Sequence, residues 1–356
     1  MKKVILLKSN IAARGGLEGY TRHLGAAFAK SGHSVTLLTT GEVPALPFEV
    51  HSLCNTTKLS LLHHLRFDAL TRKWLKENSS YDIIFGMERN CFQTHYRAGS
   101  GVHAAYLKKR ALVEPTWKRF SFSLNPLHLN LLRLEKEAFE HPNLQKLFTN
   151  SHMVREEVLE HYRVDESRLC VVPNGVDWEG SEIEVRDPQK PLHFLFVGNG
   201  YKRKGLLYLF EGLANLKEMY TLTVVGKDKN LSYFKFMAEK LGLNVHFAGP
   251  QSNLSPFYAA ADAVVIPSLY DPFANVTLEA LARGIFVVTS KMNGGKEVLT
   301  EQSGVIIENL TDPTSVQSAL LTAFAHPKTE KRACAIRESV RHLDFSHQLT
   351  AIVEQC

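Results

Sequence analysis

The chain of 356 residues is too long for one ordinary open-sheet domain and long enough for two α/β domains. Hydrophobic residues make up 44% and charged residues 22% of the sequence, a globular composition that excludes a largely disordered protein. The formal net charge of +6 permits anionic partners but does not select among phosphates, lipids and nucleic acid.

The five cysteines are scattered and form no CxxC pair, which argues against a disulfide framework or a zinc knuckle and favours a reducing compartment. The N-terminal MKKVILLKSN is basic and then apolar, but its apolar run over 4–7 is too short for a signal peptide. No run approaches the roughly 18 apolar residues that would cross a bilayer. We therefore expect a cytoplasmic protein, either soluble or peripherally attached to a membrane.

The first half of the chain has the pattern of strand, helix and strand. KKVILL at 2–7 predicts a buried parallel strand, a loop with two adjacent glycines follows, and a helix ends near Gly32. Further strands are predicted at 34–40, 81–87 and 144–150, and the last is followed by a helix beginning at Ser151.

A polar, turn-rich segment at 179–191 predicts a domain boundary, and a second α/β pattern begins at 192–200. Its further strands are predicted at 220–226, 244–250, 261–268 and 285–290, and its helices at 206–217, 231–241 and 275–283. The alternation predicts two Rossmann-like domains with parallel sheets, at 1–178 and 179–340. A last helix, 341–356, is expected to cross back to the first domain.

The segment SLYDPFANVTLEALARG at 268–284 leads from a strand through a loop into a helix. Asp271 on the loop and Glu279 on the helix could accept hydrogen bonds from ligand hydroxyls, while the amides at the helix N-terminus could bind a diphosphate. These amides belong to Ala274, Asn275 and Val276. A nucleotide sugar would satisfy all of them; the alternative is that Asp271 caps the helix and Glu279 is solvated.

A second motif, VGNGYKRKG, follows the strand at 192–200 and carries Arg203 and Lys204 side by side. A planar guanidinium beside a compact ammonium suits a diphosphate leaving group. The alternative interpretation is that both are solvated surface cations.

The D-x7-E spacing of Asp271 and Glu279 resembles the acid-x7-E signature of retaining glycosyltransferase family four, which usually has Glu at the first position. The resemblance implies a GT-B fold, in which two Rossmann-like domains face a central cleft. It further implies that Asp271 faces the donor sugar, that Glu279 faces the ribose, and that Phe273 belongs to the donor site. RKG at 203–205 is similar to the family's Arg-Lys-Gly, whereas Asn199 stands where many relatives have Arg.

Two segments of the first half resemble the same family. The loop RGGLEGYTRHL implies that Gly15 and Gly16 lie beside the donor phosphates, with Glu18 as an acceptor contact. HYRAGSGVHAAYLKKR at 95–110 is similar in wording to lipopolysaccharide-core glucosyltransferases and implies that His103 lies near the reacting sugar. The alternative for His103 is a polar residue at a loop end.

Basic and aromatic side chains alternate between 106 and 122, as in segments that attach to an anionic membrane surface. The candidate contacts are Lys108, Lys109, Arg110, Trp117, Lys118 and Arg119. The alternative is a solvated helix with one packed face; no nucleic-acid module surrounds the segment, so we expect no nucleic-acid partner.

The resemblance thus implies a retaining hexosyltransferase that needs no metal cofactor and uses a nucleotide sugar, UDP-glucose in the first place, as co-substrate. Its acceptor would be a glycan or glycolipid, with lipopolysaccharide-core synthesis at the cytoplasmic face of the inner membrane as the favoured setting. His103, Asp271, Arg203 and Lys204 are the predicted catalytic residues. The alternatives are a sugar-nucleotide epimerase, a non-catalytic nucleotide-sugar-binding protein, and a nicotinamide-dependent oxidoreductase, which the absent G-x-G-x-x-G fingerprint disfavours.

Overall fold

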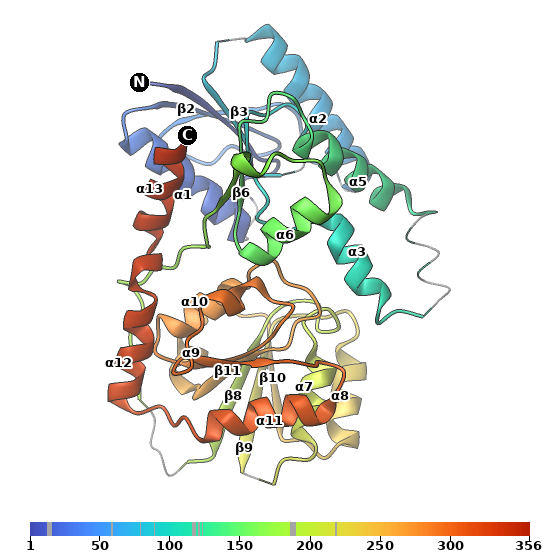
Figure 1. Cartoon of the computed structure of the whole chain (residues 1–356), viewed down its shortest axis with the longest axis vertical. Coiled ribbons are helices and arrows are strands. Elements are labelled where there is room, and N and C mark those ends of the chain that lie inside the picture. The colour runs from blue at the N-terminus through green and yellow to red at the C-terminus, as the bar shows by residue number, and fades with distance from the viewer. Residues whose placement is uncertain are drawn as a thin grey trace. The chain divides into compact units, whose positions relative to one another are not determined.

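The computed structural model describes residues 1–12, 16–57, 60–78, 80–88, 90–115, 119, 122, 124–185, 190–217 and 219–356, with only the backbone of Ser60 and Leu61. The chain forms two compact units (Figure 1). The first contains Met1–Pro173 and Ser346–Cys356, and the second is Asn174–Phe345. Within the described ranges, no helix is both long and apolar enough to cross a membrane.

The first unit is built on a seven-stranded sheet in the order β3-β2-β1-β4-β5-β6-β7, and each neighbouring pair is parallel. The chain winds outward from β1 in one direction and from β4 in the other, so the order reverses between these two strands. The strands are β1 Lys3–Leu7, β2 Ser34–Thr39, β3 Glu49–Ser52, β4 Ile83–Gly86, β5 His95–Arg97, β6 Lys146–Thr149 and β7 Leu169–Val171.

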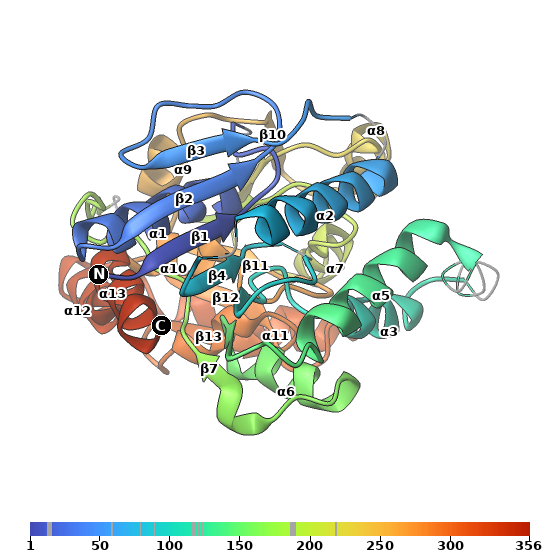
Figure 2. The ribbon, with the colours of Figure 1, turned by 90° about the horizontal axis from the view of Figure 1, so that it is seen from above.

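Helices cover both faces of this sheet (Figure 2). Phe28 of α1 packs edge-on against Phe85 of β4, with ring centroids 6.3 Å apart, while Leu75 of α2 packs with Ile5 and Leu7 of β1. The helices are α1 Gly16–Lys30, α2 Ser60–Glu77, α3 His103–Ala111, α5 Pro126–Phe139, α6 His152–His161 and the 3-10 turn η1 Glu166–Arg168.

The C-terminal helix α13, Phe345–Gln355, lies beside α1 in the first unit (Figures 1 and 2). The ammonium of Lys2 donates a hydrogen bond to the carbonyl oxygen of Cys356 at 2.8 Å, which joins the two ends of the chain. The first unit is therefore made from two separate stretches of sequence.

The second unit contains a six-stranded parallel sheet in the order β10-β9-β8-β11-β12-β13. Here the order reverses between β8 and β11. The strands are β8 Leu192–Val197, β9 Tyr220–Val225, β10 Val245–Gly249, β11 Ala263–Ile266, β12 Phe286–Ser290 and β13 Gly304–Ile307.

Alternate side chains of these strands enter two different apolar clusters, because successive residues of a strand point to opposite faces. Phe194 and Phe196 of β8 pack under α7, α8 and α11, whereas Leu195 packs under α9, α10 and α12. The helices are α7 Leu206–Leu213, α8 Leu231–Lys240, α9 Ser255–Ala260, α10 Asn275–Leu281, α11 Pro313–Phe324 and α12 Glu330–Ser339, with 3-10 turns η2 Gly294–Val298 and η3 Arg341–Leu343. The predicted α/β class with two parallel sheets is confirmed.

Candidate functional site

The two motifs of the second half meet at the point where the strand order of the second sheet reverses. Arg203 and Lys204 follow β8, and Asp271 follows β11, its direct neighbour in the sheet. In open α/β sheets, ligands bind outside the carboxyl ends of the strands at such a reversal. The fold therefore brings together two motifs that are far apart in the sequence, at a position suited to a ligand.

Lys204 and Asp271 form an ion pair at this position. The Nζ of Lys204 lies 2.5 Å from Oδ2 of Asp271, and their side chains are only 13% and 9% exposed. Arg203, whose side chain is 42% exposed, has Nη1 3.7 Å from the same oxygen and donates to the Tyr270 carbonyl at 3.3 Å. Two cations thus share one carboxylate, and the excess positive charge suits an anionic ligand.

The turn that carries these cations depends on Gly205, the glycine of the RKG motif. Gly205 has a left-handed backbone, with φ +78°, and a Cβ atom there would lie 1.7 Å from the carbonyl oxygen of Pro267. Any other residue would force apart the loops after β8 and β11. The glycine therefore allows the close approach on which the Lys204–Asp271 pair depends.

A buried asparagine, Asn293, holds the loop that leads into α10. Its Oδ1 accepts hydrogen bonds from the amides of Ala274 and Gly295, both at 3.0 Å. Its Nδ2 donates to the hydroxyls of Thr277 (3.2 Å) and Thr289 (2.9 Å). Both donors and both acceptor positions of this amide are satisfied, so the side chain fixes the loop in one conformation.

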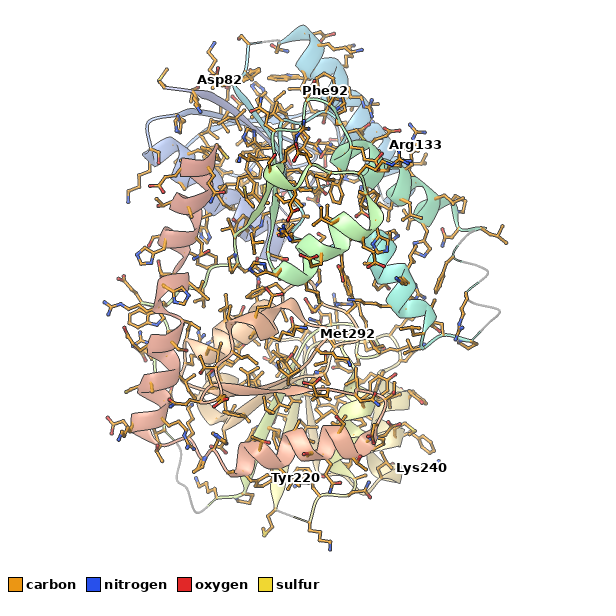
Figure 3. All side chains as sticks on the ribbon, viewed as in Figure 1. Asp82, Phe92, Arg133, Tyr220, Lys240 and Met292 are labelled. Atoms are coloured by element: carbon orange, nitrogen blue, oxygen red, sulfur yellow. The ribbon has the colours of Figure 1, made fainter. Side chains whose placement is uncertain are left out.

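The backbone around Asp271 is paired with the loop after β12. The amide of Asp271 donates to the carbonyl of Met292, which is labelled in Figure 3, and the amide of Gly294 donates to the carbonyl of Asp271, both at 3.0 Å. Sequence reasoning missed the 292–295 loop. Its signal was an Asn-Gly-Gly sequence shortly after a buried strand, on the side of an open α/β sheet where ligands bind.

The start of α10 differs in part from the expected anion site. The Ala274 amide is already bonded to Asn293, which leaves Asn275 and Val276 as the first amides without an intrahelical acceptor. Phe273 is buried in the apolar cluster under α10, so its side chain anchors the loop. Glu279 is half-buried on α10, and its Oε2 accepts a hydrogen bond from the hydroxyl of Tyr258 at 2.6 Å.

Asn199 lies in the RKG loop, at the position where many members of the family that the motif resembles have arginine. Its side chain binds a backbone amide. Its Oδ1 accepts a hydrogen bond from the amide of Lys227 at 2.9 Å. The side chain therefore links the loop after β8 to the loop after β9.

In the first unit, Gly15 lies outside the described residues, and Gly16 is the first residue of α1. Glu18 forms an ion pair with Lys8, with 3.0 Å between Oε1 and Nζ, and Lys8 also pairs with Glu88. Lys8 follows β1 and Glu88 follows β4, the strands between which the order of this sheet reverses. Sequence reasoning missed Lys8 and Glu88, although a charge soon after a buried strand was a usable signal.

His103 begins α3, and its ring faces α5. The backbone amide of His103 donates to both carboxylate oxygens of the buried Glu135, at 2.9 and 2.8 Å. Its Nε2 lies 3.1 Å from Nδ1 of His128, and burial, together with the nearby Arg110, lowers the pKa of His128. His103 is therefore fixed by contacts within the first unit.

Three of the five cations predicted as membrane contacts have carboxylate partners. The pairs are Lys108 with Glu160 (2.5 Å), Lys109 with Glu157 (2.7 Å) and Arg110 with Glu114 (3.5 Å). Arg119 donates from Nε to the Glu114 carbonyl at 2.9 Å, while Trp117 and Lys118 lie outside the described residues. These pairs reduce the positive charge that the segment would otherwise present.

Two family models match the chain. The model for glycosyl transferases group 1 matches residues 181–338, and the model for Glycosyltransferase Family 4 matches residues 14–179. Together they span both units of the structure, and the paired motifs lie inside the first match. The chain belongs to glycosyltransferase family 4 and is a retaining glycosyltransferase that uses a nucleotide sugar.

Similar proteins span nearly the full chain. The lipopolysaccharide glucosyltransferase WaaG of Escherichia coli is 24% identical, and the match covers 96% of this chain and 94% of WaaG. An uncharacterized glycosyltransferase of Methanocaldococcus jannaschii is 25% identical over 85% of this chain and 83% of its own length. The crystal structure of WaaG superposes with a TM-score of 0.78 at 22% identity over 99% of both chains. The crystal structure of Anabaena HepE in complex with UDP-glucose superposes with a TM-score of 0.72 at 16% sequence identity, and the match covers 100% of this chain and 99% of HepE. The predicted GT-B fold is confirmed.

Proposed function

We propose that the protein transfers a hexose, glucose in the first place, from a UDP-sugar to a hydroxyl group of a glycan or glycolipid acceptor, with retention of configuration. The observation that carries this proposal is the convergence of Lys204, Arg203 and Asp271 at the strand-order reversal of the second sheet. The two cations suit a diphosphate, and the carboxylate beside them suits the hydroxyls of the sugar that the diphosphate carries.

In the proposed reaction, the bond between the sugar's anomeric carbon and the diphosphate oxygen breaks, and negative charge grows on the diphosphate. Lys204 and Arg203 stabilise that charge, together with the amides of Asn275 and Val276. The acceptor hydroxyl attacks the face that the diphosphate leaves, and its proton passes to the departing oxygen. Glu279 accepts hydrogen bonds from the ribose hydroxyls, and no enzyme nucleophile is required.

The charge that a divalent metal supplies in other glycosyltransferases comes here from Lys204 and Arg203. We therefore expect transfer to continue at an unchanged rate in excess EDTA. A loss of activity that Mg²⁺ or Mn²⁺ restores would contradict this part of the proposal.

The donor is tested with purified protein and a panel of UDP-, GDP- and ADP-sugars, by calorimetry and by slow donor hydrolysis. We expect UDP-glucose to bind and to release glucose and UDP. Conversion of UDP-glucose into another UDP-sugar would favour an epimerase, and binding without turnover on any acceptor would favour a non-catalytic protein. Stabilisation by NADH alone would favour an oxidoreductase.

The acceptor part of the proposal is supported by the names of similar proteins. Besides WaaG, the lipopolysaccharide core biosynthesis glycosyltransferase LpsD of Rhizobium meliloti is 30% identical over 44% of this chain and 46% of its own length. Lipopolysaccharide cores truncated at successive sugars would serve as the acceptor panel, with radiolabelled UDP-glucose as donor. We expect glucose to be transferred to only one of these truncated cores. Transfer only to soluble sugars would contradict the proposed acceptor.

We propose a location at the cytoplasmic face of the membrane, with the 106–122 segment in contact with anionic lipid. Because its described cations are largely paired with carboxylates, we expect weak binding to phosphatidylglycerol vesicles that is lost at high salt. Equal flotation with neutral phosphatidylcholine vesicles, or no flotation at low salt, would contradict this proposal.

A further inference from the structure

Glu279, the residue proposed to bind the ribose, is held by a tyrosine from a different helix. Tyr258 lies on α9, and its hydroxyl donates to Oε2 of Glu279 on α10 at 2.6 Å. Tyr258 is fully buried, only 1% exposed, and packs in the apolar cluster beneath both helices. The phenol ring is thus fixed by packing, and its hydroxyl fixes the carboxylate.

Arg283 contacts both Tyr258 and Glu279. Its guanidinium carbon lies 4.9 Å from the centre of the Tyr258 ring, and its Nη1 donates to the backbone carbonyl of Glu279 at 3.0 Å. Arg283 therefore contacts both the ring that positions the carboxylate and the backbone that carries it. Neither contact occupies the Glu279 carboxylate, which keeps Tyr258 as its hydrogen-bond partner.

The hydrogen bond from Tyr258 has a fixed direction. Burial, and then the Glu279 charge, raise the pKa of Tyr258 well above its ordinary value, so the phenol remains protonated and donates. A hydrogen bond from a neutral hydroxyl to an ionised carboxylate is among the stronger kinds in proteins. It engages Oε2, and no described residue donates a hydrogen bond to Oε1, whose two acceptor positions are therefore available to a ligand.

We propose that Tyr258 is a positioning residue for nucleotide recognition, which holds the Glu279 carboxylate in the orientation that accepts the ribose hydroxyls. This inference rests on the proposed function, in which Glu279 contacts the ribose. A free glutamate side chain must lose rotamer freedom when it binds a diol, whereas one already held by Tyr258 has lost that freedom on folding. Removal of the hydroxyl should therefore weaken recognition of the ribose hydroxyls and leave the rest of the site intact.

The experiment compares UDP with its 2′,3′-dideoxy analogue by calorimetry, in the wild type and in three variants. The variant Tyr258→Phe removes the hydroxyl and keeps the ring, and Glu279→Ala removes the carboxylate. The matched control, Tyr220→Phe, removes a hydroxyl that donates to the Leu213 carbonyl at 3.2 Å in the same unit, at a tyrosine labelled in Figure 3.

We expect the wild type and the Tyr220→Phe variant to prefer UDP over the dideoxy analogue. Tyr258→Phe should weaken UDP binding about tenfold and leave binding of the analogue unchanged. With UDP-glucose, its KM should rise by a similar factor while kcat changes less than about twofold, because the ribose is remote from the reacting bond.

Two outcomes overturn the role of Tyr258. One is that Tyr258→Phe weakens UDP and its analogue equally, as a general structural defect would; the other is that it retains the full preference for UDP. Glu279→Ala tests the assumption beneath the inference. If Glu279→Ala keeps the preference for UDP over the analogue, Glu279 does not bind the ribose and the proposed donor site is wrong at that residue. If Glu279→Ala loses this preference and Tyr258→Phe keeps it, only the proposed role of Tyr258 is wrong.

Discussion

The ammonium of Lys204 lies 2.5 Å from the carboxylate of Asp271, although 67 positions of sequence separate them. The pair joins the loops after β8 and β11 and is largely buried. Phosphate oxygens and Asp271 would compete for the same ammonium. The pair should therefore influence both the stability of the second unit and its affinity for a diphosphate.

Replacing Lys204 should remove a main source of charge stabilisation in the reaction. We expect Lys204→Ala to lower kcat about 10²- to 10³-fold at saturating donor, the usual effect of losing one group that stabilises transition-state charge. The control is Lys235→Ala, which removes an exposed ammonium on α8. A Lys204→Ala enzyme that keeps a third or more of the wild-type kcat would contradict the assignment.

Replacing Asp271 should lower the stability of the free protein and increase the stabilisation that UDP provides. Asp271→Asn leaves the Lys204 ammonium largely buried without its counter-charge, so we expect the free energy of unfolding to fall by about 2 kcal/mol in urea titrations. UDP should then raise the Tm of the variant more than that of the wild type, because the diphosphate restores the missing negative charge.

Asp271→Glu keeps the charge and serves as the control, with a Tm response to UDP close to that of the wild type. If Asp271→Asn responds less to UDP than the wild type does, the carboxylate and the diphosphate do not compete for Lys204.

Asn293 should matter for folding as well as for activity. Asn293→Ala would leave the Ala274 and Gly295 amides and two threonine hydroxyls without their partner, and we expect a loss of about 3 kcal/mol in urea titrations. Asn253→Ala is the control, because that exposed side chain accepts one hydrogen bond, from the Ser255 amide. Equal losses in the two variants would show that the buried network adds nothing.

Because His95 is buried, we expect the protein to lose stability in mild acid. Burial, and then the charges of Lys2 and Lys146, lower the pKa of His95 to about 4 in the folded protein, whereas the ordinary value is 6.5. As the pH falls through this window, the unfolded chain binds a proton that the folded protein does not, so stability is lost. From this difference between the two pKa values, we expect the free energy of unfolding to be lower by about 3 kcal/mol at pH 4 than at pH 7.

Urea titrations at several pH values between 7 and 4 measure this slope. In His95→Gln, the slope of the unfolding free energy against pH should correspond to close to one proton fewer than in the wild type. This expectation holds whatever the substitution does to stability at pH 7. His347→Gln, at an exposed position of α13, is the matched control. An unchanged slope in His95→Gln would show that another group is responsible.

Much of the fold follows from local sequence patterns. The predicted strands at 2–7, 34–40, 192–200 and 285–290 contain β1, β2, β8 and β12, because buried parallel strands are short apolar runs. The strand His95–Arg97 was missed, since HYR contains no apolar run, and Glu49–Ser52 escaped for the same reason. Helix ends were predicted a little too late, as at α10, which ends at Leu281 ahead of the left-handed Gly284.

The site was accessible to sequence only in part. Arg203, Lys204, Asp271 and Glu279 could be proposed from their motifs, but the Lys204–Asp271 pair depends on the adjacency of β8 and β11, which no local pattern encodes. Asn293 and Tyr258 act by holding other residues and carry no motif of their own. The ring partner of His103 was equally hidden, because His128 reaches it from another helix.

The second unit is an insertion within the first. The chain enters it after Pro173 and leaves it after Phe345, and there the two crossing segments are hydrogen-bonded to each other, Val176 to Leu343 and Phe345 to Val176, both at 3.0 Å. Residues 174–345 therefore form a cassette with adjacent ends that carries Lys204, Asp271, Asn293 and Glu279. A gene fragment for residues 174–345 would encode the whole second sheet and its helices, whereas a fragment that stops at Pro173 would lack the C-terminal helix that belongs to the first unit.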